Sequence, residues 1–489
     1  MKIALLADLH YAPSCPGTRR RGDIAPILLR RAVRRLNRLV RPDVTLVLGD
    51  LLDDGTREDA PDRLARLRAI LDKLECPYLA IPGNHDGDPE RFYRVFERPG
   101  GIVDIAGARF LTFLDAEAPG HNATRAPRDL ARFQAARADF PGLIVALQHV
   151  CLFPPGTADA PYNYTNAEAI LAAMREAGPA VSVSGHYHRG TEDVRQGDLG
   201  FVCAPALCEP PFPFTVLTAD ARGHIATQRH ALAIPASLGL VDAHLHSPLA
   251  YCSEDMDVPA AIGLARDFGL RGLAFAEHSG QLYFDRKTYW SKACLRAGMA
   301  AARPEHDRTG AYLELKRAYG GEGVRFGLEA DVDYAGNLLL APGDRARFDG
   351  IVGAVHGLPS PATEPAAQRD FLFLVERILA AGATVLAHPF RVFRRSGAPV
   401  PEALFLPTAR LLRKYGAAAE INVHTNDPPV AFLRLCLELG VRFSLASDAH
   451  ELSEVGDFAH HLALLEQAGL TGDPARVIVD PTRVPRRSA

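Results

Sequence analysis

Short apolar runs alternate with longer amphipathic stretches in the first half of the chain. Each short run is bounded by polar or turn-forming residues, which is typical of buried strands. The predicted strands are residues 2–7, 44–49, 78–83, 143–148 and 180–185. Residues 24–40 and 60–74 place apolar side chains at helical spacing and predict amphipathic helices. This alternation predicts a layered α/β domain.

The second half repeats one unit, in which a strand ends on a polar residue and a helix follows. The predicted strands are residues 238–246, 271–278, 324–333, 350–357, 384–389, 418–424 and 442–450. The predicted helices lie near residues 259–268, 293–319, 368–381, 402–415, 428–439 and 454–468. Seven strand-and-helix units in succession favour a barrel-like parallel β/α fold.

A boundary between the two patterns falls near residue 237. Residues 214–218 and 224–230 read as a closing hairpin around the turn sequence ADARG, and the stretch ALAIPASLG at 231–239 reads as a linker. We therefore predict two domains, residues 1–236 and 238–489. The chain of 489 residues is long enough for each half to bury its own core.

Composition narrows the function classes only slightly. The net charge of -3 gives no overall attraction to nucleic acid or to an anionic membrane, although a local basic groove stays open. The eight cysteines are scattered without a Cys-x-x-Cys pair, which favours a reducing compartment. No apolar run approaches a membrane span, and the apolar residues before Asp8 are too few for a signal peptide. We expect a cytoplasmic protein.

Possible metal ligands follow all five predicted strands of the first half. They are Asp8 and His10, Asp50, Asn84 and His85, His149, and His186 and His188. Residues two apart in an extended segment point to the same side, so Asp8 with His10 can converge on one ion. Imidazole, carboxylate and amide donors without thiolate suit Mn, Fe or Zn. Unrelated buried histidines and capping carboxylates are a poor explanation for five such motifs in order.

These motifs resemble the calcineurin-like metallophosphoesterase family. The chain carries its pattern Asp-x-His, Gly-Asp-x-x-Asp, Gly-Asn-His-Asp, His and Gly-His-x-His over residues 1 to about 235. The resemblance implies two metal ions: one bound by Asp8, His10, Asp50 and His188, and one bound by Asp50, Asn84, His149 and His186. Asp50 would bridge the two ions.

The same resemblance leaves His85 free of metal and facing the substrate. There an imidazolium can stabilise charge on the phosphoryl group or protonate the leaving oxygen. Asp53 is the candidate partner that orients His85, although a plain turn role for Asp53 is an equally open alternative.

A second complete set of metal-binding residues occupies the strand ends of the second half. These residues are His244, His246, His278, Glu329, His356, His388, Asp448 and His450. An opening His-x-His on a β/α barrel also fits the amidohydrolases, whose two-metal site often uses a mid-barrel lysine. The lysines of this half fall in predicted helices or loops, which disfavours that alternative.

The second half instead resembles the PHP (polymerase and histidinol phosphatase) family. The motifs that carry this resemblance are Glu329, His356 in GAVHG, His388 in AHP, and Asp448 and His450 in the terminal SDAH. That resemblance implies a distorted seven-stranded β/α barrel with phosphoesterase activity and two or three Zn, Mn or Fe ions. His244, His246, Glu329 and Asp448 would bind one side of the cluster. His278, His356, His388 and His450 would complete it, with Glu329 as the bridge.

Two stretches depart from that family's pattern. Where many members have His or Asp, this chain has YCSEDMD, so Glu254 is the candidate ligand of a third metal. An inserted stretch, about residues 280–322, is expected to be either a substrate-selecting lid or a packed extra helix anchored by aromatic residues. Arg391 follows AHPF and is a candidate for binding substrate phosphate.

Three functions remain open from the sequence. The favoured one is a metal-dependent phosphoesterase with two hydrolytic sites for small phosphodiesters and phosphomonoesters. A nuclease is a weaker alternative, because no sustained basic groove interleaved with aromatic residues is visible. A single active half with a metal-stabilised regulatory half is also weaker, since both ligand sets are complete. Fold analogy does not choose the substrate.

Overall fold

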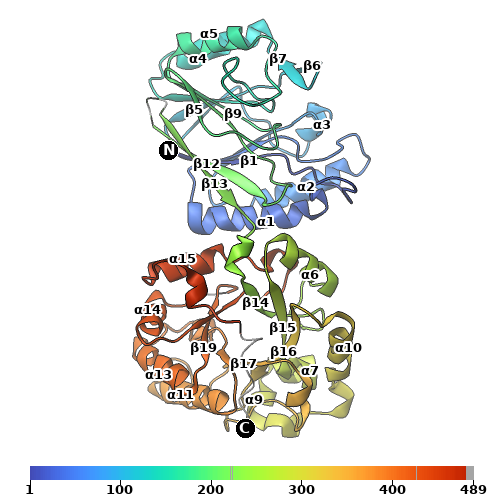
Figure 1. Ribbon diagram of the computed structural model, residues 1–489, viewed down its shortest axis with the longest axis vertical. Coiled ribbons are helices and arrows are strands. Elements are labelled where there is room, and N and C mark those ends of the chain that lie inside the picture. Colours follow the sequence, from blue (N-terminus) through green and yellow to red (C-terminus); the bar gives the residue numbers. More distant parts are fainter. Residues whose placement is uncertain (221, 223, 426, 481–489) are drawn as a thin grey trace. The chain divides into compact units, whose positions relative to one another are not determined.

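The computed structural model describes residues 1–220, 222, 224–425 and 427–480. The chain divides into two compact units, Met1–Ala233 and Ile234–Ala489 (Figure 1). Both are α/β in construction, and the predicted fold class, a layered α/β sandwich followed by a seven-stranded barrel, is confirmed. None of the helices in the described ranges combines the length and apolarity needed to cross a membrane.

Two mixed sheets form the first unit. One has the strand order β13-β12-β1-β2-β3, and the other has the order β10-β11-β9-β8-β5-β4. The first sheet consists of β1 (Lys2–Leu6), β2 (Val44–Leu48), β3 (Tyr78–Ile81), β12 (Pro213–Ala219) and β13 (Ile225–Ala231). The second consists of β4 (Ile102–Ile105), β5 (Ala108–Thr112), β8 (Leu143–Leu147), β9 (Ala180–Ser184), β10 (Val194–Gln196) and β11 (Leu199–Cys203). A separate hairpin pairs β6 (Ala116–Ala118) with β7 (Asn122–Thr124).

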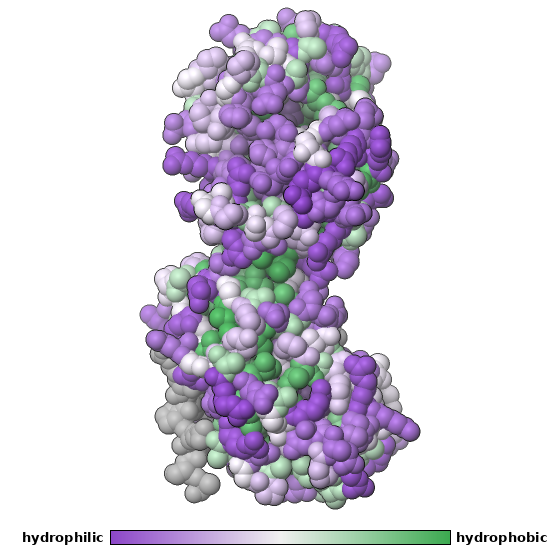
Figure 2. All heavy atoms as spheres, turned by 90° about the vertical axis from the view of Figure 1, so that its right-hand side faces the viewer, coloured by the Kyte–Doolittle hydropathy of each residue, from purple (hydrophilic) through white to green (hydrophobic). Residues whose placement is uncertain are grey.

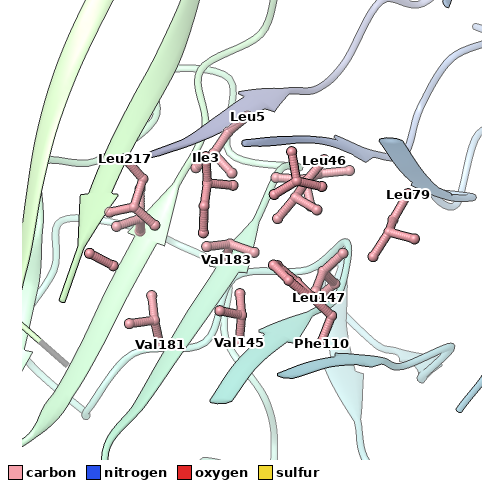
Figure 3. Close-up of a cluster of buried hydrophobic side chains, with 14 of the residues drawn as sticks. Ile3, Leu5, Leu46, Leu79, Phe110, Val145, Leu147, Val181, Val183 and Leu217 are labelled. Carbon is pink, nitrogen blue, oxygen red and sulfur yellow. The ribbon is translucent and has the colours of Figure 1, made fainter. Parts of the chain in front are cut away.

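Alternate residues of these strands meet between the two sheets. Ile3 and Leu5 of β1 face Val145 and Leu147 of β8 across a fully buried layer (Figure 3). Side chains alternate between the two faces of a strand, so the intervening residues of the second sheet face the other way. They pack under α4 (Pro127–Arg137) and α5 (Ala167–Ala177). On the face of this unit seen in Figure 2, hydrophilic side chains predominate.

The longer remaining helices of the first unit lie in the predicted amphipathic stretches, whereas the short one was not predicted. These helices are α1 (Ala25–Arg35), continued by a π-helical turn Leu36–Val40, then α2 (Ala60–Leu71) and the short α3 (Pro89–Phe92). Both α1 and α2 have proline in their first turn, where its missing N–H costs no hydrogen bond.

Seven parallel strands in chain order form a nearly closed barrel in the second unit. They are β14 (Val241–Leu245), β15 (Gly272–His278), β16 (Val324–Asp331), β17 (Ile351–Ala354), β18 (Val385–Leu386), β19 (Ala418–Asn422) and β20 (Phe443–Ala446). The first and last strands approach each other at a bridge between Leu245 and Ala449. There the Asp448 N–H donates to the His244 carbonyl at 2.8 Å.

Helices follow the barrel strands. They are α6 (Val258–Asp267), α10 (Thr309–Tyr319), α11 (Pro365–Ala380), α12 (Arg391–Arg395), α13 (Phe405–Tyr415), α14 (Val430–Glu438) and α15 (Ala459–Gln467). The prediction of one helix over 293–319 is wrong. The stretch from 279 to 297 holds α7 (Ser279–Tyr283), α8 (Arg286–Trp290) and α9 (Ala293–Ala297). Gly298 then has a φ of 63°, which ends α9, and Pro304 begins a separate 3₁₀ turn.

Candidate metal centres

The predicted ligands of the first unit lie just past the carboxyl ends of five strands. Asp8 and His10 follow β1, Asp50 follows β2, and Asn84 follows β3. His149 follows β8, and His186 and His188 follow β9. The φ angles of Asp8, His10, Asp50 and His186 are 55°, 44°, 52° and 70°. Residues other than glycine rarely adopt this left-handed backbone conformation, and such backbone strain concentrates at functional sites.

Glycines before two ligands let the strand ends approach the carboxylates. A Cβ added at Gly83 would lie 2.2 Å from Oδ1 of Asp50, and one at Gly185 would lie 2.8 Å from Oδ2 of Asp8. Both distances are shorter than real Cβ contacts. The Gly-Asn and Gly-His pairs of the motifs therefore have a steric cause.

Asp8, His10 and His188 form the first ligand group. His10 Nε2 lies 3.1 Å from His188 Nε2 and 3.9 Å from Asp8 Oδ1. Burial lowers the pKa of His10 to about 2, so its imidazole stays neutral and keeps a lone pair for a metal ion. The three side chains present their donor atoms to one point.

His149, Asn84 and His186 form the second ligand group. His149 Nε2 lies 3.1 Å from Asn84 Oδ1 and 3.2 Å from His186 Nδ1. Asp50 stands between the groups: its Oδ2 is 3.2 Å from His149 Nε2 and 3.7 Å from His10 Nε2. Burial opposes protonation of His149, but Asp50 and Asp8 outweigh it and raise the pKa of His149 to about 10. This corner of the site therefore attracts a cation.

Each of three histidines is oriented through its other ring nitrogen. His149 Nδ1 lies 2.7 Å from the Leu48 carbonyl, and His188 Nδ1 lies 2.7 Å from Glu209 Oε1. His186 Nε2 lies 3.0 Å from the His121 carbonyl. Such contacts select the tautomer and hold the ring in place. No motif pointed to Glu209, because it stands in a proline-rich loop far along the chain.

His85 lies at the edge of the first group. Its Nδ1 is 2.8 Å from the backbone carbonyl of Asp53, and its ring meets the His10 ring edge-on at 4.8 Å. The Asp53 carboxylate points elsewhere, with Oδ1 at 3.0 Å from Arg20 Nη1 and 3.3 Å from His10 Nδ1. Asp53 thus touches His85 through its main chain.

Glu329 occupies the middle of the second unit's ligand set. Its Oε1 lies 2.6 Å from His388 Nε2 and 3.3 Å from His356 Nε2, and its Oε2 lies 2.5 Å from His278 Nδ1 and 3.7 Å from His244 Nε2. Although burial opposes ionisation, the surrounding histidines hold the pKa of Glu329 well below its usual range. The carboxylate is therefore charged and can bridge ions.

Asp448 closes the other side of this cluster. Its Oδ1 lies 2.8 Å from His246 Nε2 and 3.7 Å from His244 Nε2. The His246 ring stacks on His278 with centroids 4.0 Å apart and lies 4.4 Å from the His450 ring. The structure therefore brings together, at one end of the barrel, eight of the metal ligands predicted for the second unit. The other two predicted site residues of this unit are Glu254 and Arg391.

Several buried atoms of this cluster make no hydrogen bond of acceptable geometry, although two of them, His278 Nδ1 and Glu329 Oε2, lie 2.5 Å apart. They are His244 Nε2, His278 Nδ1 and Glu329 Oε2. Leaving a buried polar atom unsatisfied costs about 1–3 kcal/mol. Imidazole nitrogens and a carboxylate oxygen that converge in this way fit divalent ions such as Zn, Mn or Fe.

Sequence reasoning missed the carboxylates that orient these histidines. Nδ1 of His244 contacts Glu420 at 2.8 Å, Nδ1 of His246 contacts Glu277 at 3.2 Å, and Nδ1 of His356 contacts Asp331 at 2.6 Å. All three carboxylates lie within predicted strands and are buried. Their position inside apolar strands could have indicated these partners, since a carboxylate buried in a strand needs a charged or hydrogen-bonding partner.

Glu254 adjoins the ligand residue His450 through its main chain. Its side chain is exposed, and its backbone N–H donates to the His450 carbonyl at 2.9 Å. From the same YCSEDMD stretch, Cys252 is the residue that touches the site, with Sγ 3.5 Å from His278 Nε2. A metal-binding role for Glu254 remains a prediction without support from this geometry.

Arg391 binds a ligand residue. It is 5% exposed, and its Nη1 donates to Asp448 Oδ2 at 2.5 Å. Its Nη2 donates to Asn422 Oδ1 at 2.5 Å. In this arrangement Arg391 holds Asp448 in place, and its contact with substrate phosphate remains a prediction.

Part of the inserted stretch after β15 packs in a small apolar cluster, and another part lies beside the metal-ligand cluster of the second unit. Tyr283 and Phe284 are buried in a small apolar cluster with Leu295. The Tyr289 ring lies 5.9 Å from the His278 ring, whereas the neighbouring Trp290 is 53% exposed. The stretch therefore forms packed short helices that also place one aromatic ring beside the cluster.

Comparisons with known proteins give different matches for the two halves. Residues 1–190 match the family model described as calcineurin-like phosphoesterase. A probable cyclic nucleotide phosphodiesterase of Synechococcus sp. is 36% identical over 100 residues, which cover 20% of this chain and only 36% of that relative. A probable histidinol-phosphatase of Deinococcus radiodurans is 27% identical over 243 residues, 45% of this chain and 89% of that relative.

Two solved structures are similar to parts of the chain. A dimetal phosphatase from Danio rerio has 19% identity and a TM-score of 0.37, and the match covers 46% of this chain and 98% of that one. A histidinol phosphate phosphatase from Lactococcus lactis, complexed with zinc, L-histidinol and phosphate, has 18% identity and a TM-score of 0.31. That match covers 48% of this chain and 95% of the other.

Proposed function

Because residues 1–190 form a calcineurin-like phosphoesterase domain, we propose that the chain is a phosphoesterase with two separate hydrolytic sites. The family and the relatives named as phosphodiesterase and phosphatase support a metal-dependent phosphoric ester hydrolase. The observation that carries the second site is the buried cluster around Glu329, whose donors all come from residues of the second unit. The proposed substrates are small phosphodiesters and phosphomonoesters, with nucleic acid less favoured.

In the first site, Asp8, His10, Asp50 and His188 would hold one divalent ion, and Asp50, Asn84, His149 and His186 the other. Such a pair binds a phosphoryl group and lowers the pKa of bound water toward neutrality. In hydrolysis the water oxygen forms a bond to phosphorus while the phosphorus–oxygen bond of the ester breaks. His85, held at the Asp53 carbonyl, would give a proton to the departing oxygen.

Replacing His85 with alanine should lower turnover by the first site about 100-fold or more while both ions stay bound, as expected for a general acid that binds no metal. The measurement is ester hydrolysis together with the metal content of the purified protein. His224→Ala is the control, because His224 lies in the same unit on an exposed turn with Asp220. A metal-free His85→Ala protein would overturn the proposed role.

A fragment of the second unit should fold and bind two or three ions by itself. The fragment should begin at or before Ile234 instead of at 237, because the Ile234 N–H donates to the Phe268 carbonyl at 2.9 Å. Circular dichroism and metal analysis provide the test, with a fragment that starts at Leu240 as a comparison. Failure of the longer fragment to bind any metal would contradict an independent second site.

The two sites would act in sequence on one small phosphodiester. The first site would cleave the diester to a monoester and an alcohol, and the second would hydrolyse the monoester to inorganic phosphate and a second alcohol. Carrying both sites on one chain raises the effective concentration of the intermediate. Phosphorus NMR should show phosphate release by the intact protein and monoester accumulation by His244→Ala. Phosphate release by His244→Ala at the wild-type rate from every diester would contradict the sequence of steps.

A further inference from the structure

A cavity of about 250 Å³ opens beside the second ligand group of the first unit. Asn84, His149 and His186 form one part of its lining. Phe113, Leu114 and Val150 supply an apolar part. A molecule whose phosphoryl group lies on the metal ligands therefore has an adjoining space for another of its groups.

His121 and His186 line this cavity, and Tyr162 lies next to His186 without lining the cavity. The Tyr162 ring meets the His186 ring edge-on at 4.7 Å, and the His121 ring lies 6.2 Å from Tyr162. The β6–β7 hairpin places His121 there, and the His121 carbonyl is held by His186 Nε2 at 3.0 Å. Edge-on and offset contacts of this kind also accept a further ring from a ligand.

The charges around the cavity disfavour a second anionic group in it. Among the described residues that line it there is no lysine or arginine. The lining residue Asp115 is satisfied within the protein, by Arg125 and by the Tyr164 hydroxyl, each at 2.7 Å. The second lining carboxylate, Glu117, is 59% exposed and would repel an anion. Arg20, in contrast, contacts the first ligand group.

The size and exposed apolar surface of the cavity match one ring system. Leu114 is 46% exposed and lines the cavity, so its apolar surface is open to a ligand there. The cavity is larger than the roughly 150 Å³ of an engineered apolar cavity that binds benzene. It is smaller than the ~300 Å³ at which pockets for drug-sized ligands begin.

We propose that this cavity binds an uncharged aromatic or heteroaromatic ring carried by the phosphate ester. The ring lies against Leu114 and the His121 ring, which both line the cavity, while the phosphoryl group lies between the two ligand groups. This inference rests on the proposed function of the first site and names its substrate class. It predicts selectivity for an aromatic group over an alkyl group of equal charge.

The test compares phenylphosphonate with methylphosphonate as inhibitors of the full-length protein loaded with Mn²⁺. The assay uses an ester whose hydrolysis His85→Ala lowers about 100-fold or more, so that the signal reports the first site. Phenylphosphonate should inhibit at least about tenfold more tightly, as burial of a ring against apolar side chains predicts. Leu114→Ala should remove most of this preference, and the control Ile102→Ala, at an equally exposed apolar residue of the same unit, should retain it.

Equal inhibition by the two phosphonates, or an unchanged preference in Leu114→Ala, would overturn the ring-binding proposal while leaving the first site a phosphoesterase. Failure to find any ester whose hydrolysis depends on His85 would instead overturn the proposed function. The two failures are therefore distinguishable in one set of measurements.

Discussion

Replacing Asp50 with alanine should abolish ester hydrolysis by the first unit and release two metal ions per chain. Asp50 Oδ2 lies between the two ligand groups, 3.7 Å from His10 Nε2 and 3.2 Å from His149 Nε2. Its Oδ1 accepts the His85 N–H at 2.8 Å, so the same side chain also positions the loop that carries the proposed acid. Asp8 reaches the second group only through the main-chain N–H of His186, whereas Asp50 lies beside ring nitrogens of both groups. Metal analysis and hydrolysis assays measure the two effects together.

Asp54→Asn is the matched control for this prediction. Asp54 is an exposed neighbour in the same loop, and its carboxylate accepts hydrogen bonds from the hydroxyl and N–H of Thr56. Asp54→Asn should therefore keep both ions and wild-type turnover. An Asp50→Ala protein that retained its full metal content would show that Asp50 is not the bridging ligand.

Replacing Glu329 with glutamine should empty the second unit of metal and stop its phosphate release. Glutamine keeps the shape of the side chain but removes the charge that sits among four histidine nitrogens. Removing a group that only orients a ligand costs about 10- to 100-fold in metal affinity, so loss of a shared ligand should cost more. Metal titration of the full-length variant measures this loss.

Glu254→Gln is the control, and it also tests the sequence prediction for Glu254. Because its side chain is exposed, the variant should bind as many ions as the wild type. Loss of one ion from Glu254→Gln would establish it as a ligand after all. Full metal binding by Glu329→Gln would contradict the placement of Glu329 at the centre.

Local sequence patterns were enough to predict most of the fold and most of the candidate metal ligands. A polar residue directly after an apolar strand must lie at the strand's end, and parallel strands bring such ends to one edge. Asp8 and Asp50 could be placed together in this way, whereas His149 follows a strand of the other sheet and was grouped with them through the family resemblance. The helix expected over 293–319 failed because Gly298 and Pro304 interrupt it, and apolar periodicity outweighed them in the prediction.

Contacts between distant parts of the chain could not be predicted in the same way. Glu209 holds His188, and Glu420 holds His244 across 176 residues of sequence. The direction of a side chain also depends on its rotamer and on its neighbours, as the Asp53 carboxylate shows by turning to Arg20. The cavity beside His186 has the same origin, because its walls come from several strands and loops.

The sequence by itself determined the two α/β units, the strand ends and the residue types that converge there. These follow from the two-residue period of strands and from the burial of apolar runs, which are properties of short segments. Only the tertiary structure decided that the Glu254 side chain is exposed, that Arg391 holds Asp448, and that Leu114 is left exposed beside the metal ligands. Each of these depends on how segments far apart in the chain pack against one another, and packing of that kind leaves no periodic trace in the sequence.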